Sequence, residues 1–521
     1  MEFLNNIEPR EYQKEIFKTC IGKNCLVVLP TGLGKTLIAL MLTIERMKTF
    51  PGEKVLFLAP TKPLAEQHLK YFKKNLPELF GEMQLFTGTV NSENRKKIWQ
   101  TADIIFSTPQ CISNDLKKRM YNLKDVCLLI EDEAHRCIKN YDYNYIAQEY
   151  KKQSLHPRII GLTASPGSEK SKIKDICKNL FIEEVELRGR ESSGVKEYLQ
   201  ELEFEKIMLD FPPEFEDMRK VLLKLFNEYV EELRTRKVLF GPASKTDLIN
   251  LQKKISATIA RNFTNFNYML GASACAQAIK IQHALELLET QTLESFNKYI
   301  KKLFEQALKK QSRGVVKLVS KPEFNFVFMQ SNELLSKKRE HPKIQKLIDI
   351  IIQEKEKNAK MKMIIFTQFR DTASNISKRI NEIEGIKSKI FIGQAKKGEG
   401  EADKGLSQRE QQEILHEFSL GKINILVATQ IAEEGLDIIE INNVIFYEPI
   451  PSAIRTIQRR GRTARLMPGK VIVLITKKTR DEAFFYVSKS REKKMKIAIE
   501  SIKDDMTKEN KIEIQKKLEI E

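Results

Sequence analysis

The sequence has 521 residues, of which 41% are hydrophobic and 31% charged, and its formal net charge is +19. This length suffices for roughly three or four domains, and no apolar run approaches the ~20 residues that span a bilayer, so we expect no membrane association. The 7 cysteines form no C-x-x-C pair and no zinc spacing, which argues against a disulfide scaffold or a structural zinc site. Such a basic surplus favours a polyanionic partner, most simply nucleic acid, although a surface that is basic only for solubility would carry the same charge.

A glycine-bearing turn at residues 30–36 follows the apolar run 25–29 and precedes a helix-forming run. In this strand–turn–helix context, backbone N–H groups and a helix N-terminus can hold polyphosphate. Lys35 is expected to reach the β- and γ-phosphates, and the Thr36 hydroxyl to hold Mg²⁺. Leu29 stands where the generic phosphate-loop pattern has glycine, so the pattern alone also allows a turn that binds nothing. The predicted nucleotide contacts here are Pro30, Thr31, Gly32, Leu33, Gly34, Lys35 and Thr36, together with Gln13 upstream, whose amide can pair with an adenine edge.

Alternating strand and helix patterns follow, and polar residues recur where the predicted strands 55–59, 83–86 and 103–107 end. In a doubly wound parallel sheet, ligands bind at the carboxyl ends of the strands. Each such residue is common in loops, but together they could hold a sugar–phosphate backbone without reading bases. The predicted nucleic-acid contacts at these ends are Pro60, Thr61, Lys62, Thr87, Gly88, Thr108 and Pro109.

The next buried strand, residues 126–130, leads into an acidic motif that ends at His135. Asp132 can hold Mg²⁺ through a water opposite Thr36, and Glu133 can polarise the attacking water. The alternative is an acidic loop without catalytic role, which the upstream phosphate loop disfavours. The residues predicted to couple this site to nucleic acid, in this motif and after the next strand, are His135, Thr163 and Ser165.

Long amphipathic helical patterns replace the alternation between residues 190 and 335, which predicts a helical domain after a first α/β domain of residues 1–189. A helix over residues 296–313 would place five apolar residues on one face: Phe296, Ile300, Leu303, Phe304 and Ala307. Four basic residues would fall on the opposite face: Lys298, Lys302, Lys309 and Arg313. This basic stripe either lies along a nucleic-acid duplex or is an ordinary solvated face.

Alternation then resumes, which predicts a second α/β domain of residues 336–480 and a charged helix over 481–521. Its predicted strands are 361–366, 389–393, 423–428, 442–447 and 471–475. The predicted nucleic-acid contacts at strand ends are Gln368, Arg370 and Thr429. The arginine-rich segment 458–465 could bind nucleic acid or stabilise charge on a transferring phosphoryl group. The basic segment 489–496 is assigned to structural bracing.

With these segments in order, the chain resembles a superfamily 2 helicase. The matching segments are 30–36, 59–63, 132–135 and 163–165 in the first α/β domain, and 429–437 and 458–465 in the second. The resemblance implies an α/β fold of two RecA-like, doubly wound parallel-sheet domains with a helical insert between them, and ATP and Mg²⁺ as cofactors; leucine at position 29 is normal for it. The implied catalytic residues are Lys35, Asp132, Glu133, Gln458, Arg462 and Arg465, of which the last two are arginine fingers. Gly435 and Asp437 are implied nucleotide contacts, the latter at the ribose.

Residues 366–373 and 447–455 carry a narrower resemblance, to archaeal Hef and its relative, the Fanconi anaemia group M helicase. That family implies ATP-driven 3′-to-5′ translocation on forked and branched DNA in replication-fork repair, with the insert gripping the branched duplex. An alternative is a double-stranded-RNA-stimulated ATPase of the RIG-I-like or Dicer type, which the lack of a zinc-binding cysteine set after the core disfavours. The completeness of the phosphate, metal and finger residues argues against a scaffold with a vestigial ATPase.

Two further expectations concern partners and location. Hef carries a nuclease domain and a helix–hairpin–helix tail, and neither is found before Glu521. The nuclease is therefore a separate subunit, or the chain is truncated, or this is a helicase-only relative; a sliding clamp is a further candidate partner. The first residues lack a signal-peptide pattern, so we expect a cytoplasmic, nucleoid-associated protein of a prokaryote.

Overall fold

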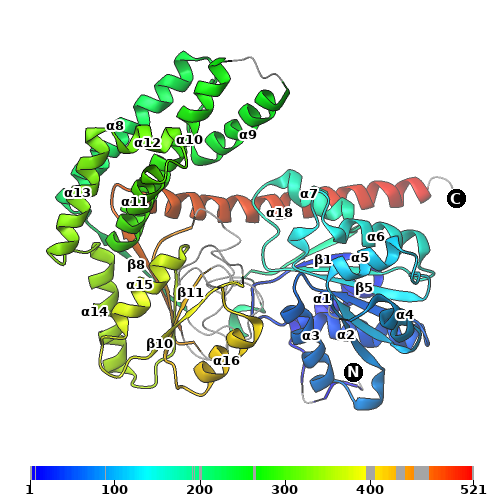
Figure 1. Ribbon diagram of the computed structural model, residues 1–521. Coiled ribbons are helices and arrows are strands. Elements are labelled where there is room, and N and C mark those ends of the chain that lie inside the picture. Colours follow the sequence, from blue (N-terminus) through cyan, green and yellow to red (C-terminus); the bar gives the residue numbers. More distant parts are fainter. Residues whose placement is uncertain are drawn as a thin grey trace.

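The computed structural model describes residues 3–5, 7–88, 90–189, 192, 194–198, 202–261, 266–394, 405–429, 441–450 and 469–518. Figure 1 shows two α/β domains side by side and a helical bundle standing over the second of them. The long helix α18 (Arg480–Leu518) runs from the second domain to the first. The architecture confirms the predicted fold class of two parallel-sheet domains with a helical insert.

The first domain is built on seven parallel strands in the order β3-β4-β2-β5-β6-β1-β7. These strands are β1 (Cys25–Val28), β2 (Lys54–Leu58), β3 (Met83–Phe86), β4 (Ile104–Ser107), β5 (Val126–Asp132), β6 (Ile159–Thr163) and β7 (Glu184–Leu187). The helices are α1 (Glu11–Gly22), α2 (Lys35–Thr49), α3 (Lys62–Asn75), α4 (Ser92–Thr101), α5 (Pro109–Lys117), α6 (Asp142–Gln153) and α7 (Lys170–Asn179). Every residue of β5 is buried, which explains its nearly continuous apolar run. The edge strand β7 was not predicted, because its four residues alternate acidic and apolar.

The register of this sheet brings three loops together. Val28 at the end of β1 pairs with Thr163 at the end of β6, and Asp132 at the end of β5 pairs with Leu162. The loops that follow β1, β5 and β6 therefore leave the same edge of the sheet as neighbours.

The second domain has six parallel strands in the order β10-β11-β9-β12-β13-β8. They are β8 (Leu202–Leu209), β9 (Met363–Phe366), β10 (Ser388–Phe391), β11 (Ile425–Ala428), β12 (Asn443–Phe446) and β13 (Gly469–Thr476). Its helices include α14 (Pro342–Lys357), α15 (Arg370–Ile380) and α16 (Gln408–Ser419). β8 lies within residues 190–335, which were predicted as helical, and that prediction was wrong for this strand. β8 pairs with β13 along its whole length, but as an edge strand it carries charged residues instead of a buried apolar run.

The helical insert follows β8, so it interrupts the second domain. Its helices are α8 (Pro213–Thr235), α9 (Lys245–Arg261), α10 (Phe266–Thr290), α11 (Leu293–Leu308), α12 (Arg313–Val319) and α13 (Pro322–Ser336). The single helix predicted over residues 296–313 is wrong, because α11 ends at Leu308 and Lys310 adopts a left-handed φ of +49°. The predicted apolar face of α11 is nonetheless in the core of the insert, where Phe296, Ile300 and Leu303 are buried.

Helix α18 joins all three parts. At its start, Arg480 N donates to Glu289 Oε2 of α10 at 2.9 Å. Further along, Met495 and Ile499 belong to the hydrophobic core of the first domain. Asp505 then forms ion pairs with Lys170 and Lys174 of α7, each at 3.1 Å. The helix therefore ties the insert and the second sheet to the first domain.

Candidate nucleotide and nucleic-acid site

The phosphate loop connects β1 to α2 through two glycines with positive φ, Gly32 at +86° and Gly34 at +77°. Gly34 is the N-cap of α2, so the first helical turn of α2, with its backbone N–H groups, begins at the loop. Lys35 Nζ donates to Leu29 O at 2.9 Å and curls back over the loop. Thr31 Oγ1 is buried, and the described residues offer it no hydrogen-bond partner. A polyphosphate would satisfy these donors, so the loop fits the predicted ligand.

The Gln13 side chain supports this loop through hydrogen bonds. Its Nε2 donates to Leu33 O at 3.0 Å, and its Oε1 accepts from Arg10 N at 2.9 Å. Tyr12 supports the same carbonyl, because its hydroxyl donates to Leu33 O at 2.8 Å. A Cβ added at Gly34 would lie 2.3 Å from Gln13 Nε2 and would displace that amide, and φ here is +77°, so this position favours glycine. The structure thus gives Gln13 a loop-supporting contact, and its contact with adenine stays a prediction.

Asp132 lies at the end of β5, buried beside a histidine from α3. His68 Nε2 is 2.8 Å from Asp132 Oδ2, and the Tyr143 hydroxyl donates to Asp132 O at 2.7 Å. Burial alone would raise the pKa of the Asp132 carboxyl, but the interaction with His68 and the charge of Lys35 hold that pKa below its ordinary value. Asp132 is therefore a carboxylate at neutral pH, as a Mg²⁺ ligand must be.

The predicted coupling residues meet next to this carboxylate. Glu133 has a left-handed φ of +50°, a strained conformation that is common at functional sites. His135 Nδ1 lies 3.2 Å from both Glu133 Oε2 and Thr163 Oγ1. Thr163 Oγ1 also accepts from Ser165 N at 3.1 Å, and Ser165 Oγ is 2.8 Å from Met495 Sδ of α18. A chain of contacts therefore runs from the acidic motif to α18, although its coupling role stays a prediction.

The residues predicted to contact nucleic acid in the first domain lie at the same edge of the sheet as the phosphate loop. They follow β2 (Pro60, Thr61, Lys62), β3 (Thr87, Gly88) and β4 (Thr108, Pro109). These strands occupy one half of the sheet and β1 the other, with β5 and β6 between them. The acidic motif and Thr163 thus lie between the predicted nucleotide and nucleic-acid contacts.

Comparison with known proteins agrees with the division of the chain into two α/β domains and a helical insert. The family model described as DEAD/DEAH box helicase matches residues 10–173, and the helicase conserved C-terminal domain matches residues 342–467. A helical-bundle model named for an ATP-dependent RNA helicase matches residues 214–338. The crystal structure of the Pyrococcus furiosus Hef helicase domain is similar with a TM-score of 0.70 and 41% identity, over 92% of this chain and 98% of that one. The chain belongs to the superfamily 2 helicases of the Hef and Fanconi anaemia group M type.

Longer relatives in this helicase family match most of the chain. A Methanocaldococcus jannaschii protein named for an ATP-dependent RNA helicase is 38% identical over 492 residues, covering 94% of this chain and 60% of that protein. The mouse Fanconi anemia group M protein homolog is 31% identical over 533 residues, covering 95% and 26%. The ATP-dependent DNA helicase mph1 of Neurospora crassa is 30% identical over 496 residues, covering 92% and 42%. The chain therefore spans less than two thirds of the length of each of these relatives.

In the second helicase domain, the predicted nucleic-acid contacts that are described also lie at carboxyl strand ends. Gln368 N donates to Glu448 Oε1 at 2.5 Å, and Arg370 Nη2 donates to Gly393 O at 2.9 Å. Thr429 follows β11, the neighbour of β9. Five predicted residues lie outside the described part of the chain: Gly435, Asp437, Gln458, Arg462 and Arg465.

The predicted basic stripe of the insert is not one helical row, because the helix predicted to carry it ends at Leu308. Lys298 on α11 forms an ion pair with Asp371 of the second domain. Lys302 is exposed on the same helix, whereas Lys309 is its C-cap and Arg313 begins α12. Lys298 thus joins two domains in this structure, and a duplex contact by the four residues stays a hypothesis.

The sequence pattern did not identify His68 as part of the site. A histidine on the buried face of the helix that begins with Lys62 was the available signal. This signal was not used, because the contact between α3 and the end of β5 exists only in the folded sheet.

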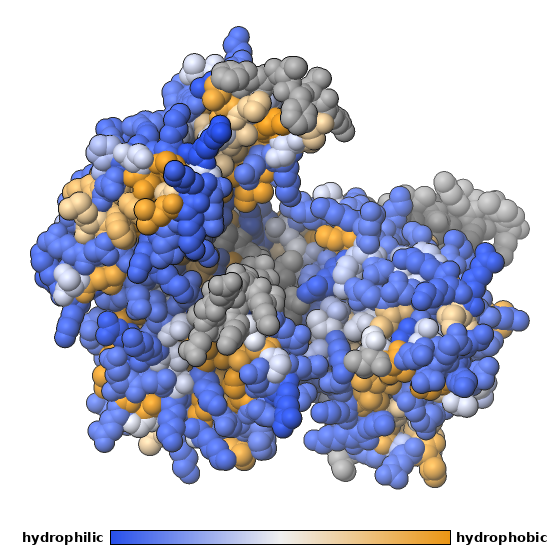
Figure 2. Space-filling model, viewed as in Figure 1, coloured by the Kyte–Doolittle hydropathy of each residue, from blue (hydrophilic) through white to orange (hydrophobic). Residues whose placement is uncertain are grey.

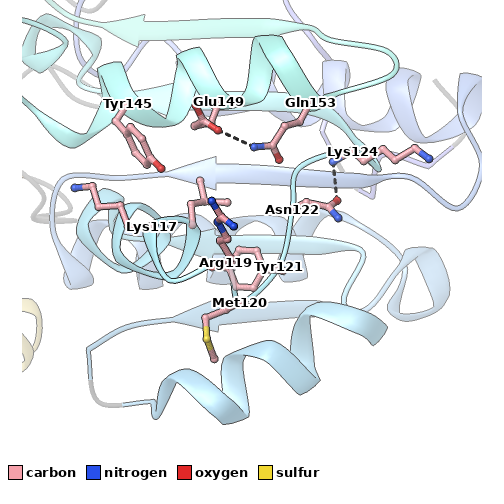
Figure 3. Close-up of a pocket in the computed structure, with 10 residues that line it drawn as sticks. Lys117, Arg119, Met120, Tyr121, Asn122, Lys124, Tyr145, Glu149 and Gln153 are labelled. Carbon is pink, nitrogen blue, oxygen red and sulfur yellow. Dashed lines mark hydrogen bonds between the residues drawn. The ribbon is translucent and has the colours of Figure 1, made fainter.

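The pocket in Figure 3 is separate from this site. It has a volume of about 920 Å³ and lies between α5 and α6, where Lys117, Tyr121 and Glu149 line it. The loop that forms it leads into the amino end of β5, so it opens at the edge opposite to the phosphate loop. We assign it no part in the nucleotide chemistry. Of the helices in the described residues, none combines the length and the apolar character needed to cross a membrane.

Proposed function

We propose that the chain is an ATP-dependent DNA helicase or translocase that moves 3′ to 5′ and remodels forked and branched DNA in replication-fork repair. The observation that supports this most strongly is the shared edge of the first sheet. There, Asp132, Glu133 and Thr163 lie between the phosphate loop and the predicted nucleic-acid contacts. A change at the nucleotide has a short route to the nucleic acid along these contacts.

ATP hydrolysis would use residues of both helicase domains. The phosphate loop would hold the β- and γ-phosphates through its N–H groups and Lys35, and Glu133 would orient and polarise the attacking water. Mg²⁺ would be held by Thr36 and Asp132 and would neutralise charge on the phosphates. The described residues contain no cluster of three or more His, Cys, Asp or Glu side chains, which fits an ion that takes most ligands from water and substrate. Arg462 and Arg465 are proposed to reach the same phosphates from the second domain.

Movement on nucleic acid would follow from domain closure over ATP and release after hydrolysis. Figure 2 shows the surface hollowed between the helical insert and the first domain. A bound duplex in this hollow would touch the insert while its strand crossed the carboxyl edges of the two sheets. The net charge of +19 favours such a polyanion.

A second candidate is a double-stranded-RNA-stimulated ATPase. It is favoured by the names of the Methanocaldococcus relative and of the helical-bundle model, both of which refer to RNA helicases. The names of the fungal and mouse relatives refer to DNA helicases or to Fanconi anaemia group M. We therefore favour DNA over RNA as the substrate.

Unwinding of a labelled fork by wild type, Lys35→Ala and Glu133→Gln tests the assigned site. Both variants are expected to lose unwinding and ATP hydrolysis, because one lacks the phosphate ligand and the other the group that polarises water. Arg409→Ala, in an exposed ion pair on α16, serves as the control and should retain both activities. Wild-type ATP turnover in either site variant would show that the site is wrongly assigned.

A further inference from the structure

A hollow on the surface lies where the edge strand β8 meets the first half of α18. It has a volume of about 370 Å³ and is lined by Phe204, Phe485, Lys489, Glu492, Lys493 and Lys496. No residue of the nucleotide site or of the predicted nucleic-acid contacts lines it. Its composition is unusual for a structural brace, because it combines aromatic rings with a row of lysines.

The lysines form a row because of their spacing. Lys489, Lys493 and Lys496 are exposed and lie one helical turn apart on one face of α18, which places them about 6 Å and then 4.5 Å apart along the axis. No ion pair joins any of them to another described residue. The next face of the helix, which includes Met495 and Ile499, is buried against the first domain. The row therefore faces solvent on a helix whose neighbouring face is packed against the first domain.

Aromatic rings continue this row at its start. The rings of Phe204 and Phe485 stack with centroids 6.4 Å apart and planes inclined by 16°. Lys206 Nζ lies over the rings of Phe485 and Tyr486, at 5.7 Å and 5.9 Å. Phe204 is 41% exposed and Tyr486 52%, so both rings retain open surface beside the lysines.

The acidic residues nearby do not cancel this charge. Glu203 and Glu205 project from β8 on the side opposite to Phe204 and Lys206, because side chains alternate along a strand. Both form ion pairs with Lys470, at 3.4 Å and 2.7 Å. Glu492 is the one acidic residue among those that line the hollow.

We propose that this hollow is an additional binding site for single-stranded nucleic acid. Lys489, Lys493 and Lys496 hold successive phosphates, and the open rings of Phe204 and Tyr486 stack on bases. A positive groove combined with aromatic platforms is the usual means of binding single strands without sequence preference. The inference rests on the proposed function, because a nucleic-acid motor provides the strand. Since α18 bridges the two helicase domains, a strand held here is retained while the domains move.

The test is fluorescence anisotropy of the full chain with a labelled oligothymidine, without nucleotide and over a series of salt concentrations. K489E/K493E/K496E is expected to weaken binding by at least about tenfold. It should also reduce the slope of log affinity against log salt by about 2, since each of the three lost phosphate contacts contributes about 0.7 to that slope. F204A/Y486A is expected to weaken binding about tenfold with the slope unchanged, because it removes stacking but no charge.

The matched control K378E/K387E/K422E changes the net charge by the same amount on exposed lysines near β10 and β11, at the opposite side of the second sheet. It is expected to keep oligothymidine affinity within about twofold of wild type. Equal losses in the control and α18 variants would reduce the effect to net charge and overturn the proposal. Unchanged affinity in the α18 variants would overturn it as well, in favour of an acidic protein partner for this surface.

ATP hydrolysis without nucleic acid distinguishes this inference from the proposed function. The α18 variants should keep the wild-type basal rate, which also shows that they fold. If the charge reversals lower that rate, the milder K489Q/K493Q/K496Q is used in their place. It should also weaken oligothymidine binding, and it is judged against the same outcomes. A chain that hydrolyses no ATP but loses oligothymidine affinity on these substitutions would contradict the proposed function and retain the second site.

Discussion

The residues around the phosphates show how packing prepares a charged site. Asp132 is buried, yet its carboxyl stays ionised because His68 and Lys35 lie close to it. Gly34 lies so close to Gln13 that a Cβ there would displace the Gln13 amide. Both contacts can be tested by single substitutions.

Loss of the His68 contact is expected to slow ATP hydrolysis. A hydrogen bond to a charged group is worth about 1.5–3 kcal/mol, so His68→Ala should lower the rate by roughly 10- to 100-fold. His68→Gln keeps a donor of similar reach and should recover part of the rate. Steady-state hydrolysis with saturating nucleic acid measures both variants, and a wild-type rate in His68→Ala would show that Asp132 does not depend on this contact.

Gly34→Ala is expected to weaken nucleotide binding. The added Cβ would meet Gln13 Nε2 at 2.3 Å and displace it from Leu33 O, in a backbone conformation that already costs L residues about 1 kcal/mol. Gly52→Ala is a matched control, because Gly52 has φ +86° but no atom within 4 Å of an added Cβ. Titration with a fluorescent ATP analogue should show wild-type affinity for the control and lower affinity for Gly34→Ala. Equal affinities would mean that the loop can shift at no cost.

At the scale of elements, the insert is held together by a buried carboxylate and its partners as well as by its apolar core. Glu286 of α10 forms ion pairs with Lys245 of α9 and with His283. Burial would raise the pKa of Glu286, but these two partners lower it to about 2, from an ordinary value of 4.5. The contribution of this carboxylate to stability is thus complete above pH 4.5 and is lost as the pH falls towards 2.

Glu286→Gln should therefore change the acid sensitivity of the insert. At pH 7 the variant is expected to be about 2 kcal/mol less stable, after allowance for the partly exposed Lys245. Between pH 4.5 and 2 it should lose less stability than wild type, because it has no proton to gain. Thermal unfolding midpoints at pH 7 and pH 3 give the comparison. Parallel pH dependence in both proteins would contradict the assigned pKa.

The sequence predicted those elements whose signals are local. The strands β1, β2, β4, β5 and β6 of the first sheet are largely buried apolar runs followed by polar turns, and β3 is half-buried. Their positions and the predicted site residues at their ends therefore followed from pattern and resemblance. β8 was not predicted, because an edge strand that contains Glu203, Glu205 and Lys206 lacks such an apolar run. The end of α11 at Leu308 was not predicted, because the amphipathic pattern continues past it and only the left-handed conformation of Lys310 marks the break. His68 and Met495 depend on contacts between distant segments, which a single sequence does not encode locally.

At the scale of the whole molecule, the insert and the second helicase domain pack as one unit. Lys343 at the start of α14 forms a fully buried ion pair with Asp481 of α18 and donates to Thr290 O of α10 at 3.0 Å. Asn375 Nδ2 of α15 donates to Thr292 Oγ1 and Ser295 Oγ, each at 3.1 Å. The first domain is tied to this unit by α18, so motion driven by ATP should move the insert together with the second sheet.

Breaking the buried pair should loosen this junction. Lys343→Met leaves the buried Asp481 carboxyl without its cation, which costs about 3–5 kcal/mol. Lys337→Met removes the exposed pair with Glu333 and should cost less than about 1 kcal/mol. Thermal unfolding of the two variants measures the difference, and equal midpoints would show that the junction does not depend on the Lys343 pair.

The most direct test of the central claim is ATP hydrolysis by the purified chain, with Lys35→Ala as the blank. Single-stranded DNA, linear duplex, a fork, a four-way junction and double-stranded RNA are compared as activators at equal nucleotide concentration. We predict the highest turnover with forked or four-way DNA. The highest turnover with double-stranded RNA would contradict the DNA-remodelling account and support the RNA-stimulated alternative.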